Sequence, residues 1–331
     1  MRIALDAMGG DYAPREMVAG AAAFLRAGGG NVQLTLVGDS EKIERCLSDV
    51  RAVALPIQVV HAAEAVEMHE APAAALRKKK DASIRVAVRL VASGQADAVV
   101  SAGNTGAVVA AAKMELAALA GIDRPAIAAL IPGPFGATVL LDAGATINCK
   151  ALHLLQFAQM GVCYAQYALR RTHPMVGLLS VGEEDAKGTD VTRDAFRLLR
   201  ESRLHFYGNV EGRDFFSGKV DVIVCDGFVG NVALKVMEGM ACGMRTLFER
   251  GSNAHWWLRA LQRVAVLPVW RRMGRRLDAT RFGGAPLLGV AGTCIIAHGN
   301  SRAAAVVSAI ERAREAVAQQ VNERITEVLA A

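Results

Sequence analysis

Cysteine is scarce in this sequence: six residues are scattered over 331 positions, and no two of them form a Cys-x-x-Cys pair. Cys225 and Cys294 lie inside apolar runs. This distribution argues against a disulfide framework and is typical of a reduced, cytosolic protein. Strand-like sequence begins at Arg2, so no signal peptide is expected.

The motifs of several large enzyme classes are missing. The sequence has no G-x-G-x-x-G dinucleotide fingerprint, no G-x-x-x-x-G-K-[ST] phosphate loop, and no H-E-x-x-H or zinc-spaced Cys/His cluster. A G-x-S-x-G nucleophile elbow is absent as well. These absences disfavour hydride transfer, ATP chemistry, metal-dependent hydrolysis and acyl-serine catalysis.

Only one uncharged stretch, Ala151–Leu169, is about long enough to cross a bilayer. Four polar side chains interrupt it: His153, Gln156, Gln159 and Gln166. The stretch therefore predicts a buried or interface helix and not a membrane span.

Acidic residues are outnumbered, with 32 Asp and Glu against 38 Lys and Arg, which gives a formal net charge of +6. An excess of positive charge favours acidic partners, namely nucleic acid, anionic lipid or an acidic protein. The excess is concentrated between Arg245 and Arg281, where nine arginines face only Glu249 and Asp278. All three tryptophans of the chain fall in the same stretch.

We name residues 251–281 the basic arm and expect it to be helical up to Pro268, which breaks a helix. Two hypotheses stay open: a peripheral membrane contact through tryptophan and arginine, or an arm packed on a second subunit. The run from Arg77 to Lys80 either binds an acidic partner or is solvated charge. The expected membrane or carrier contacts are Trp256, Trp257, Arg259, Arg263, Trp270, Arg271, Arg272, Arg77, Lys78 and Lys79.

What the sequence does have is a repeated pattern, in which an apolar run ends in a small or acidic residue and a glycine-rich turn. Runs without alternation suit strands buried on both faces of a parallel sheet, where ligands bind beyond the carboxyl ends of the strands. Glycine there lets the backbone approach a ligand, and a following helix favours anions. The five instances are Ile3–Asp11, Ala96–Gly106, Ala137–Ala145, Val176–Gly188 and Asp221–Asn231.

The order of these elements predicts an α/β protein, with one continuous, doubly wound, mostly parallel sheet in three α/β/α layers, over a single domain of residues 1–331. A division of this domain into two lobes around a cleft is an open alternative. Ile127–Ile131 and Thr138–Leu141 are expected to form a hairpin within the sheet, joined by a turn at Pro132, Gly133 and Pro134. One long helix is expected from Arg302 to Leu329. Met237, Met240 and Met244, at helical spacing, are expected in the core, with an acyl-chain groove as the alternative.

The turn DGFVGN leads into a helix and is one candidate anion site. Amides near Gly230 and Asn231 would point at the anion, and Lys235 lies one turn further on. Two simpler interpretations remain open, with Asp226 as a cap of the turn and Lys235 as a surface residue.

Three other loops carry candidates for the same chemistry. Lys187 in GEEDAKG would bring an ammonium over a phosphate, although a solvated loop is an open alternative. Asn104 and Thr105 open a helix, where Asn104 is either a ligand or a plain N-cap. His298 would donate to a thioester oxygen or a leaving thiolate, unless it is structural. Asp6, Gly9 and Gly10 in the first turn complete the expected phosphate-binding set.

Six phrases in the same order resemble one family, the PlsX phosphate acyltransferases of bacterial phospholipid synthesis, over nearly the whole chain. They are ALDAMGGD at Ala4–Asp11, ALRKKKDAS at Ala75–Ser83, SAGNTGA at Ser101–Ala107, GEEDAKG at Gly182–Gly188, CDGFVGNVALKVMEG at Cys225–Gly239 and GAPLLGV at Gly284–Val290. Two departures exist: Thr146 stands where the family usually has Asn, and Ile296 where it often has Lys. We assign neither residue a role.

The resemblance implies a homodimeric enzyme that makes acyl phosphate and free carrier from acyl-acyl-carrier-protein and inorganic phosphate, upstream of glycerol-3-phosphate acyltransferase. It also implies a fold like phosphotransacetylase or isocitrate dehydrogenase, a cytoplasmic location with peripheral membrane association, and no metal, nucleotide cofactor or nucleic-acid partner. Lys187, Asn231 and His298 are the residues we expect to be catalytic.

Two other functions compete with this one. A phosphotransacetylase that acts on short acyl-CoA would use the same chemistry without needing the tryptophan- and arginine-rich arm. A non-catalytic protein that binds membranes or nucleic acid through the arm would show salt-sensitive binding and no turnover.

Overall fold

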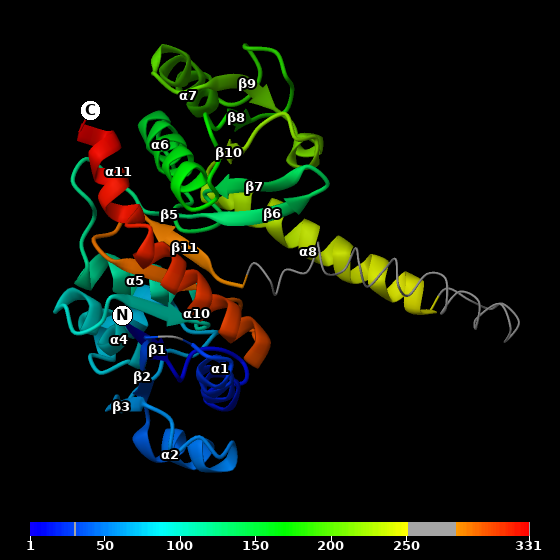
Figure 1. Ribbon diagram of the computed structural model, residues 1–331. Helices are drawn as coiled ribbons and strands as arrows, with labels where there is room; N and C mark the ends of the chain where they lie inside the picture. Colours follow the sequence, from blue (N-terminus) through cyan, green and yellow to red (C-terminus); the bar gives the residue numbers. More distant parts are fainter. Residues whose placement is uncertain (30, 251–282, 331) are drawn as a thin grey trace, which may run out of the picture.

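The computed structural model describes residues 1–29, 31–250 and 283–330. The chain builds two β-sheets, each made mostly of parallel strands and flanked by helices (Figure 1). The α/β class is therefore as expected, but the prediction of one continuous sheet was wrong. The basic arm lies outside the described residues.

The larger sheet has seven strands in the order β3-β2-β1-β4-β12-β11-β5. The first five of these run parallel, and β11 is antiparallel to both of its neighbours. The strands are β1 (Arg2–Asp6), β2 (Gln33–Gly38), β3 (Ile57–His61), β4 (Ala98–Ser101), β5 (Ala126–Ile127), β11 (Ala285–Leu288) and β12 (Thr293–Ile296).

The smaller sheet has five strands in the order β6-β7-β10-β8-β9, and only β6 is antiparallel to its neighbour. The predicted hairpin is confirmed as β6 and β7, although its turn falls at Pro134 and Phe135. The strands are β6 (Ala129–Gly133), β7 (Gly136–Leu141), β8 (Val176–Leu179), β9 (Phe206–Val210) and β10 (Val222–Val224).

A single apolar run passes from one sheet to the other. Ala126 and Ile127 pair with β11 in the larger sheet, Ala128 is buried between, and Ala129 begins the edge strand of the smaller sheet. An uninterrupted run of small and β-branched residues has no feature that marks this change of partner. That is why the sequence predicted one sheet where there are two.

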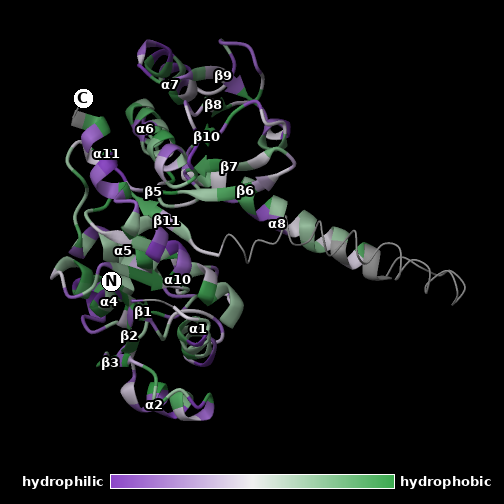
Figure 2. Ribbon diagram, in the orientation of Figure 1, coloured by the Kyte–Doolittle hydropathy of each residue, from purple (hydrophilic) through white to green (hydrophobic). Residues whose placement is uncertain are grey.

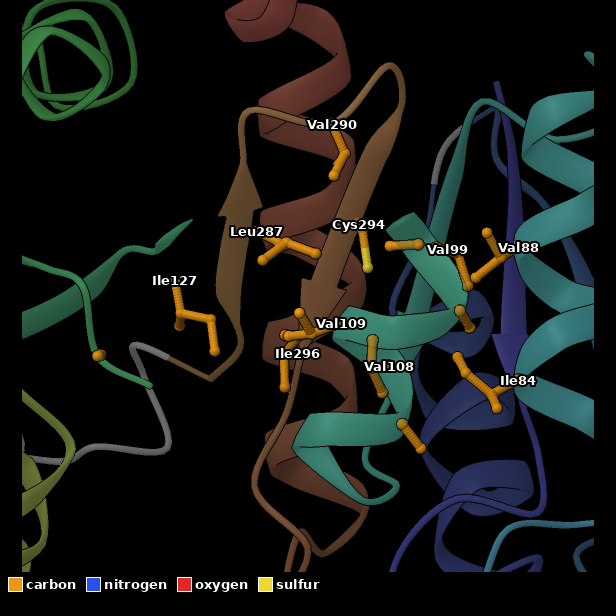
Figure 3. Close-up of a cluster of buried hydrophobic side chains, with 14 of the residues drawn as sticks. Ile84, Val88, Val99, Val108, Val109, Ile127, Leu287, Val290, Cys294 and Ile296 are labelled. Atoms are coloured by element: carbon orange, nitrogen blue, oxygen red, sulfur yellow. The ribbon is translucent and has the colours of Figure 1, made fainter. Parts of the chain in front are cut away.

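Helices cover both faces of the larger sheet because its strand residues alternate between two cores. Ile3 and Leu5 of β1 face the core with α1, α2 and α10, while Ala4 faces the core with α4 and α5. Figure 3 shows the second of these cores, in which Val99, Val108 and Cys294 come together from β4, α5 and β12. The helices are α1 (Arg15–Arg26), α2 (Ser40–Asp49), α3 (Pro72–Lys78), α4 (Ser83–Ala92), α5 (Thr105–Glu115) and α10 (Ala303–Ala318).

A third core lies between the smaller sheet and two helices, α6 (Ala151–Tyr167) and α7 (Asp190–Glu201). Leu154, Phe157 and Met160 of α6 are buried there, which confirms that the uncharged stretch forms a buried helix. No helix in the described ranges is long and apolar enough to cross a bilayer. A 3-10 turn, η1 (Gly212–Phe216), lies between β9 and β10.

The expected C-terminal helix is two helices, α10 and α11 (Val321–Ala330). Gln320 breaks it with a φ of 53°, a left-handed backbone that cannot continue an α-helix. α11 then packs beside α6 on the smaller sheet. The chain thus passes from the larger sheet to the smaller one again at this break.

Helix α8 (Gly227–Arg250) follows β10 and extends away from both sheets (Figure 1). Met240 and Met244 are exposed on it, at 62% and 48%, and only Met237 packs against a core. The expectation that all three methionines are core residues was therefore wrong. Helical spacing alone does not tell whether an apolar stripe meets the same sheet, another partner or solvent.

Candidate active site

The carboxyl ends of three central strands of the larger sheet stand level with one another. Asp6 ends β1, Ser101 ends β4 and Ile296 ends β12, and these residues are paired in register. The loops that follow are consequently neighbours, and the Asp11 N–H donates to the Gly299 carbonyl at 2.8 Å. Three segments far apart in the sequence are therefore brought to one edge of the sheet.

Asp6 anchors this edge from below. Its buried carboxylate accepts hydrogen bonds from the hydroxyls of Ser83, at 2.6 Å, and Ser101, at 2.7 Å. Burial raises the pKa of Asp6, while the hydrogen bonds act in the opposite direction. Both oxygens of Asp6 are therefore engaged inside the protein, where they hold the loops together.

The two glycines after Asp6 are required by close packing of these loops. A Cβ on Gly9 would lie 2.7 Å from both Asp6 Oδ2 and the Gly103 nitrogen. Gly10 has a φ of 106°, and its Cβ would lie 3.0 Å from the Gly299 carbonyl oxygen. Both positions therefore need a residue without a side chain, because neighbouring loops of the protein pack against them.

Asn104 is fully engaged by the protein. Its Oδ1 accepts from the Ala107 N–H at 3.2 Å, which is the N-cap interaction, and its Nδ2 donates to the carbonyls of Met68 and Glu70. The capping alternative is therefore what the structure shows. Thr105 is the first residue of α5 and is exposed at the same edge.

The smaller sheet has an equivalent anchor that the sequence pattern did not single out. Asp142 follows β7, is fully buried and accepts four backbone N–H groups, from Ile127, Gly144, Ala145 and Thr146, at 2.6–3.0 Å. Burial raises the pKa of Asp142 and these four donors oppose it. The signal was present, because Asp142 ends its apolar run just as Asp6 does.

Thr146, one of the two departures from the resemblance, has a structural role. Its hydroxyl donates to the Pro125 carbonyl at 3.1 Å, and its own carbonyl accepts from the Gly227 N–H at 2.9 Å. The residue therefore fastens the loop after β7 to the start of α8. The other departure, Ile296, is the buried last residue of β12.

The start of α8 packs directly on the Asp142 loop. Asp226 caps the helix by accepting from the Phe228 and Val229 N–H groups, both at 3.0 Å, which confirms the cap expected of it. Gly230 is the point of closest approach, because a Cβ there would lie 1.9 Å from the Asp142 carbonyl oxygen. Asn231 is exposed beside Gly144.

Lys187 lies exposed on the loop between β8 and α7. The loop is held from beneath by Asn209, whose Nδ2 donates to the Glu184 carbonyl at 2.8 Å. Two acidic side chains of this loop form ion pairs with arginines, Glu183 with Arg213 at 3.1 Å and Asp185 with Arg200 at 2.8 Å. These two carboxylates are thus paired with arginines and not with Lys187.

One direct contact joins the loops of the two sheets. Lys235 Nζ on α8 lies 2.6 Å from His298 Nε2, on the loop after β12. Glu238, which the sequence interpretation missed, contacts both, at 2.8 Å from Lys235 Nζ and 3.4 Å from His298 Nε2. The hydrogen bond from His298 is the first cause that lowers the pKa of Glu238 to about 2.

The predicted residues therefore form two groups, one at each sheet, and Lys235 with His298 connects them. Asp6, Gly9, Gly10, Asn104 and Thr105 belong to the larger sheet. Asp226, Gly230, Asn231 and Lys187 belong to loops of the smaller sheet.

The residues expected to contact the carrier or the membrane differ in whether the protein itself already binds them. Arg77 and Lys78 are exposed at the end of α3, whereas Lys79 Nζ is bound within the chain, to Glu70 at 2.6 Å and the Ala65 carbonyl at 2.7 Å. Lys79 therefore fastens a loop and is not free for a partner. The arm residues lie outside the described residues: Trp256, Trp257, Arg259, Arg263, Trp270, Arg271 and Arg272.

The fold is that of the phosphotransacetylases. A phosphotransacetylase from Streptococcus pyogenes superposes with a TM-score of 0.62 at 18% identity, covering 95% of this chain and 94% of that one. EutD phosphotransacetylase from Staphylococcus aureus gives a TM-score of 0.60 at 16% identity over the same shares.

Sequence similarity is closer and identifies the family. A protein-family model described as "Fatty acid synthesis protein" matches residues 1–324. The phosphate acyltransferase of Pelotomaculum thermopropionicum is 50% identical over 98% of this chain and 94% of its own length. That of Heliobacterium modesticaldum is 49% identical, covering 99% and 97%. The chain belongs to the PlsX family of phosphate acyltransferases, enzymes of fatty acid and phospholipid synthesis.

Proposed function

We propose that this enzyme transfers a fatty acyl group from acyl-acyl-carrier-protein to inorganic phosphate, giving acyl phosphate and free carrier. The full-length similarity to phosphate acyltransferases carries this proposal. The position that we propose for the active site is supported by the loops at the carboxyl ends of the strands, because the Lys235–His298 contact joins the loops of the two sheets. Family membership in an enzyme class sets aside the non-catalytic hypothesis.

The chemistry suits a site without a covalent nucleophile. Phosphate is an anionic nucleophile at neutral pH, and its oxygen forms a bond to the thioester carbon while the carbon–sulfur bond breaks. The proton that HPO4²⁻ loses ends on the sulfur of the leaving thiol. A free thiol has a pKa of about 8.5, so the thiolate leaves readily. The protein has to hold both reactants in line and stabilise the oxyanion that develops.

We assign the positive side chains Lys187 and Lys235 to phosphate and to the developing oxyanion. The exposed amide of Asn231 and the glycine loops after β1 and β4 supply neutral donors. His298 is assigned to the proton that ends on sulfur. Asp6, Asp142, Asn104 and Asp226 hold these loops in place and do not touch substrate.

Trapping with hydroxylamine tests the reaction directly. Purified protein is incubated with long-chain acyl-acyl-carrier-protein and phosphate, and acyl hydroxamate is measured with and without phosphate. We expect phosphate-dependent hydroxamate and a matching release of carrier thiol. Turnover of short acyl-CoA with no turnover of the carrier substrate would instead establish the phosphotransacetylase alternative.

We further propose that the enzyme is a homodimer that pairs through α8. The helix carries an apolar stripe at spacings of three and four, with exposed fractions of 41–72%: Val229, Val232, Val236, Met240, Met244 and Leu247. In Figure 2 the helix is largely pale to green where it leaves the body of the protein. A continuous apolar face of this kind marks an interaction surface, and a second copy offers the matching one.

Replacing both Val236 and Met240 by Asp is expected to dissociate the dimer, because four carboxylates would be buried at a symmetric interface. We predict a rise in dimer Kd of at least about 100-fold by analytical ultracentrifugation. The matched control is Val53→Asp, at a valine that is still more exposed (73%) and lies in a loop before β3. A wild-type chain that sediments as a monomer would contradict the proposal.

Peripheral membrane contact through the basic arm stays a prediction from the sequence. Replacing Trp256, Trp257 and Trp270 by Ala should reduce flotation with anionic liposomes by about tenfold or more, because interfacial tryptophans supply most of the apolar burial. Flotation equal to that of the wild-type protein would rule out this docking mode.

A further inference from the structure

Lys235, Glu238 and His298 form a cluster of three titratable side chains, which we name the bridge cluster. One oxygen of Glu238, Oε2, lies 2.8 Å from Lys235 Nζ and 3.4 Å from His298 Nε2. The two nitrogens are themselves 2.6 Å apart. A single carboxylate oxygen thus contacts both nitrogens of a hydrogen-bonded pair.

The nitrogen–nitrogen contact restricts where protons can be. An ammonium group has three donors and no acceptor, and an imidazole nitrogen accepts only when it carries no proton. A hydrogen bond between Lys235 Nζ and His298 Nε2, which lie 2.6 Å apart, therefore needs a proton on one nitrogen and the lone pair of the other. Two protonated nitrogens would offer no acceptor, so this geometry fits one shared proton.

The bridge cluster faces the proposed site and stays accessible. Asn231, Lys235 and Glu238 are spaced four and three residues apart, so they share one face of α8, away from its apolar stripe. The side chains of Lys235 and His298 are 50% and 48% exposed. A ligand at the carboxyl ends of the strands can therefore reach both nitrogens.

The surrounding charges leave Glu238 as the one carboxylate in contact with this pair among the described residues. On the neighbouring loop after β1, Asp11 lies close to Gly299. Further along, Arg302 pairs with Glu16 at 3.4 Å and stacks on the ring of Tyr12. Arg302 and Glu16 thus neutralise each other, and Asp11 lies beside Gly299, the residue that follows His298.

We propose that Glu238 is a positioning residue, which holds Lys235 and His298 as a proton-sharing pair that carries the phosphate proton to the leaving thiolate. This inference rests on the proposed acyl transfer. As the carbon–sulfur bond breaks, the pair gives its shared proton to sulfur, which frees a lone pair on one of the two nitrogens. The proton on the phosphate oxygen then passes to that lone pair, and the pair returns to its starting state.

The charge on Glu238 determines the expected pH dependence. Its pKa, lowered to about 2, keeps the carboxylate ionised wherever the enzyme works. An anion beside a protonated nitrogen stabilises that proton, so removing the charge lets the shared proton leave at lower pH. Glu238→Gln should therefore move the alkaline limb of the kcat/KM profile down by about one pH unit. This shift is small for the loss of a neighbouring charge, because solvent screens the charges of a half-exposed cluster.

The test is the pH profile of acyl phosphate formation for wild type, Glu238→Gln and Glu238→Asp. Glu238→Asp keeps the charge and should keep the alkaline limb in place, even if kcat falls. The matched control is Glu327→Gln, since Glu327 pairs with Arg324 at the same three-residue helical spacing, at 2.9 Å, on α11. That control should leave rate and profile unchanged.

A downward shift in Glu238→Gln alone, with an unchanged unfolding temperature, supports the positioning role. A lower rate with an unshifted profile would show a purely structural role and overturn it, as would an unchanged rate and profile. Absence of acyl phosphate from the wild-type enzyme would overturn the proposed function together with this role. An active enzyme with no shift would overturn the role alone.

Discussion

Replacing Gly230 by Ala is expected to reduce acyl phosphate formation at least about 100-fold and to lower the free energy of unfolding by about 3 kcal/mol. The new Cβ would lie 1.9 Å from the Asp142 carbonyl oxygen and 3.0 Å from Cys225 Sγ. The Asp142 loop cannot give way easily, because four N–H groups hold its carboxylate. Helix α8 must move instead, and Asn231, Lys235 and Glu238 move with it.

Gly239→Ala is the matched control on the same helix. A Cβ at Gly239 meets nothing within 4 Å. Alanine there should stabilise α8 by about 0.5–1 kcal/mol and leave activity intact. Steady-state kinetics and urea unfolding measure both variants. If Gly230→Ala keeps full activity and stability, the packing of α8 on the Asp142 loop does not position the site.

Replacing Lys187 by Ala is expected to lower kcat about 10²–10³-fold, the usual loss when one preorganised donor to a developing anion is removed. The free energy of unfolding should stay within about 0.5 kcal/mol of wild type, because the side chain is exposed. Single-turnover kinetics with saturating phosphate measure the first quantity, and urea unfolding the second.

Lys42→Ala provides the comparison, since Lys42 is also exposed and lies on α2, where it pairs with Asp39 at 3.2 Å. It should keep wild-type kcat. A Lys187→Ala enzyme that turns over like the Lys42→Ala enzyme would remove Lys187 from the mechanism and leave the loop as solvated surface.

The sequence predicted which edge of the fold gathers the candidate residues, because strand ends and glycine turns are local features. It did not predict the two sheets. Whether an apolar run such as Ala126–Ile131 continues in one sheet or passes to another depends on the strands that pair with it. Those strands, β11 and β7, lie elsewhere in the sequence.

The roles within the site were less predictable than its place. Asp6 and Asn104 are the right kind of residue for a ligand, and both are occupied by partners that local patterns do not show. Asp6 binds Ser83, 77 positions away, and Asn104 binds the carbonyl of Met68, 36 positions away. A polar residue at a strand end thus predicts a loop anchor as readily as a ligand contact.

The bridge cluster shows the same limit at longer range. Helical spacing places Lys235 and Glu238 on one face of α8, but His298 is 63 positions from Lys235 and follows a strand of the other sheet. Only the packing of the first turns of α8 against a core with residues from both sheets brings these residues together. Glu238 was missed because its partner across the sheets cannot be identified from the spacing on one helix.

Locating the bound phosphate is the most direct measurement of whether the two sets of loops form one site. A crystal of the wild-type enzyme soaked with phosphate, or with arsenate for stronger anomalous signal, would reveal the anion. We predict density at the carboxyl ends of the strands, within hydrogen-bonding distance of Lys235 or His298. Density found only in the cavity of about 390 Å³ lined by Arg170, Arg171, His173, Arg203 and His205, at the opposite ends of β8 and β9, would contradict this site.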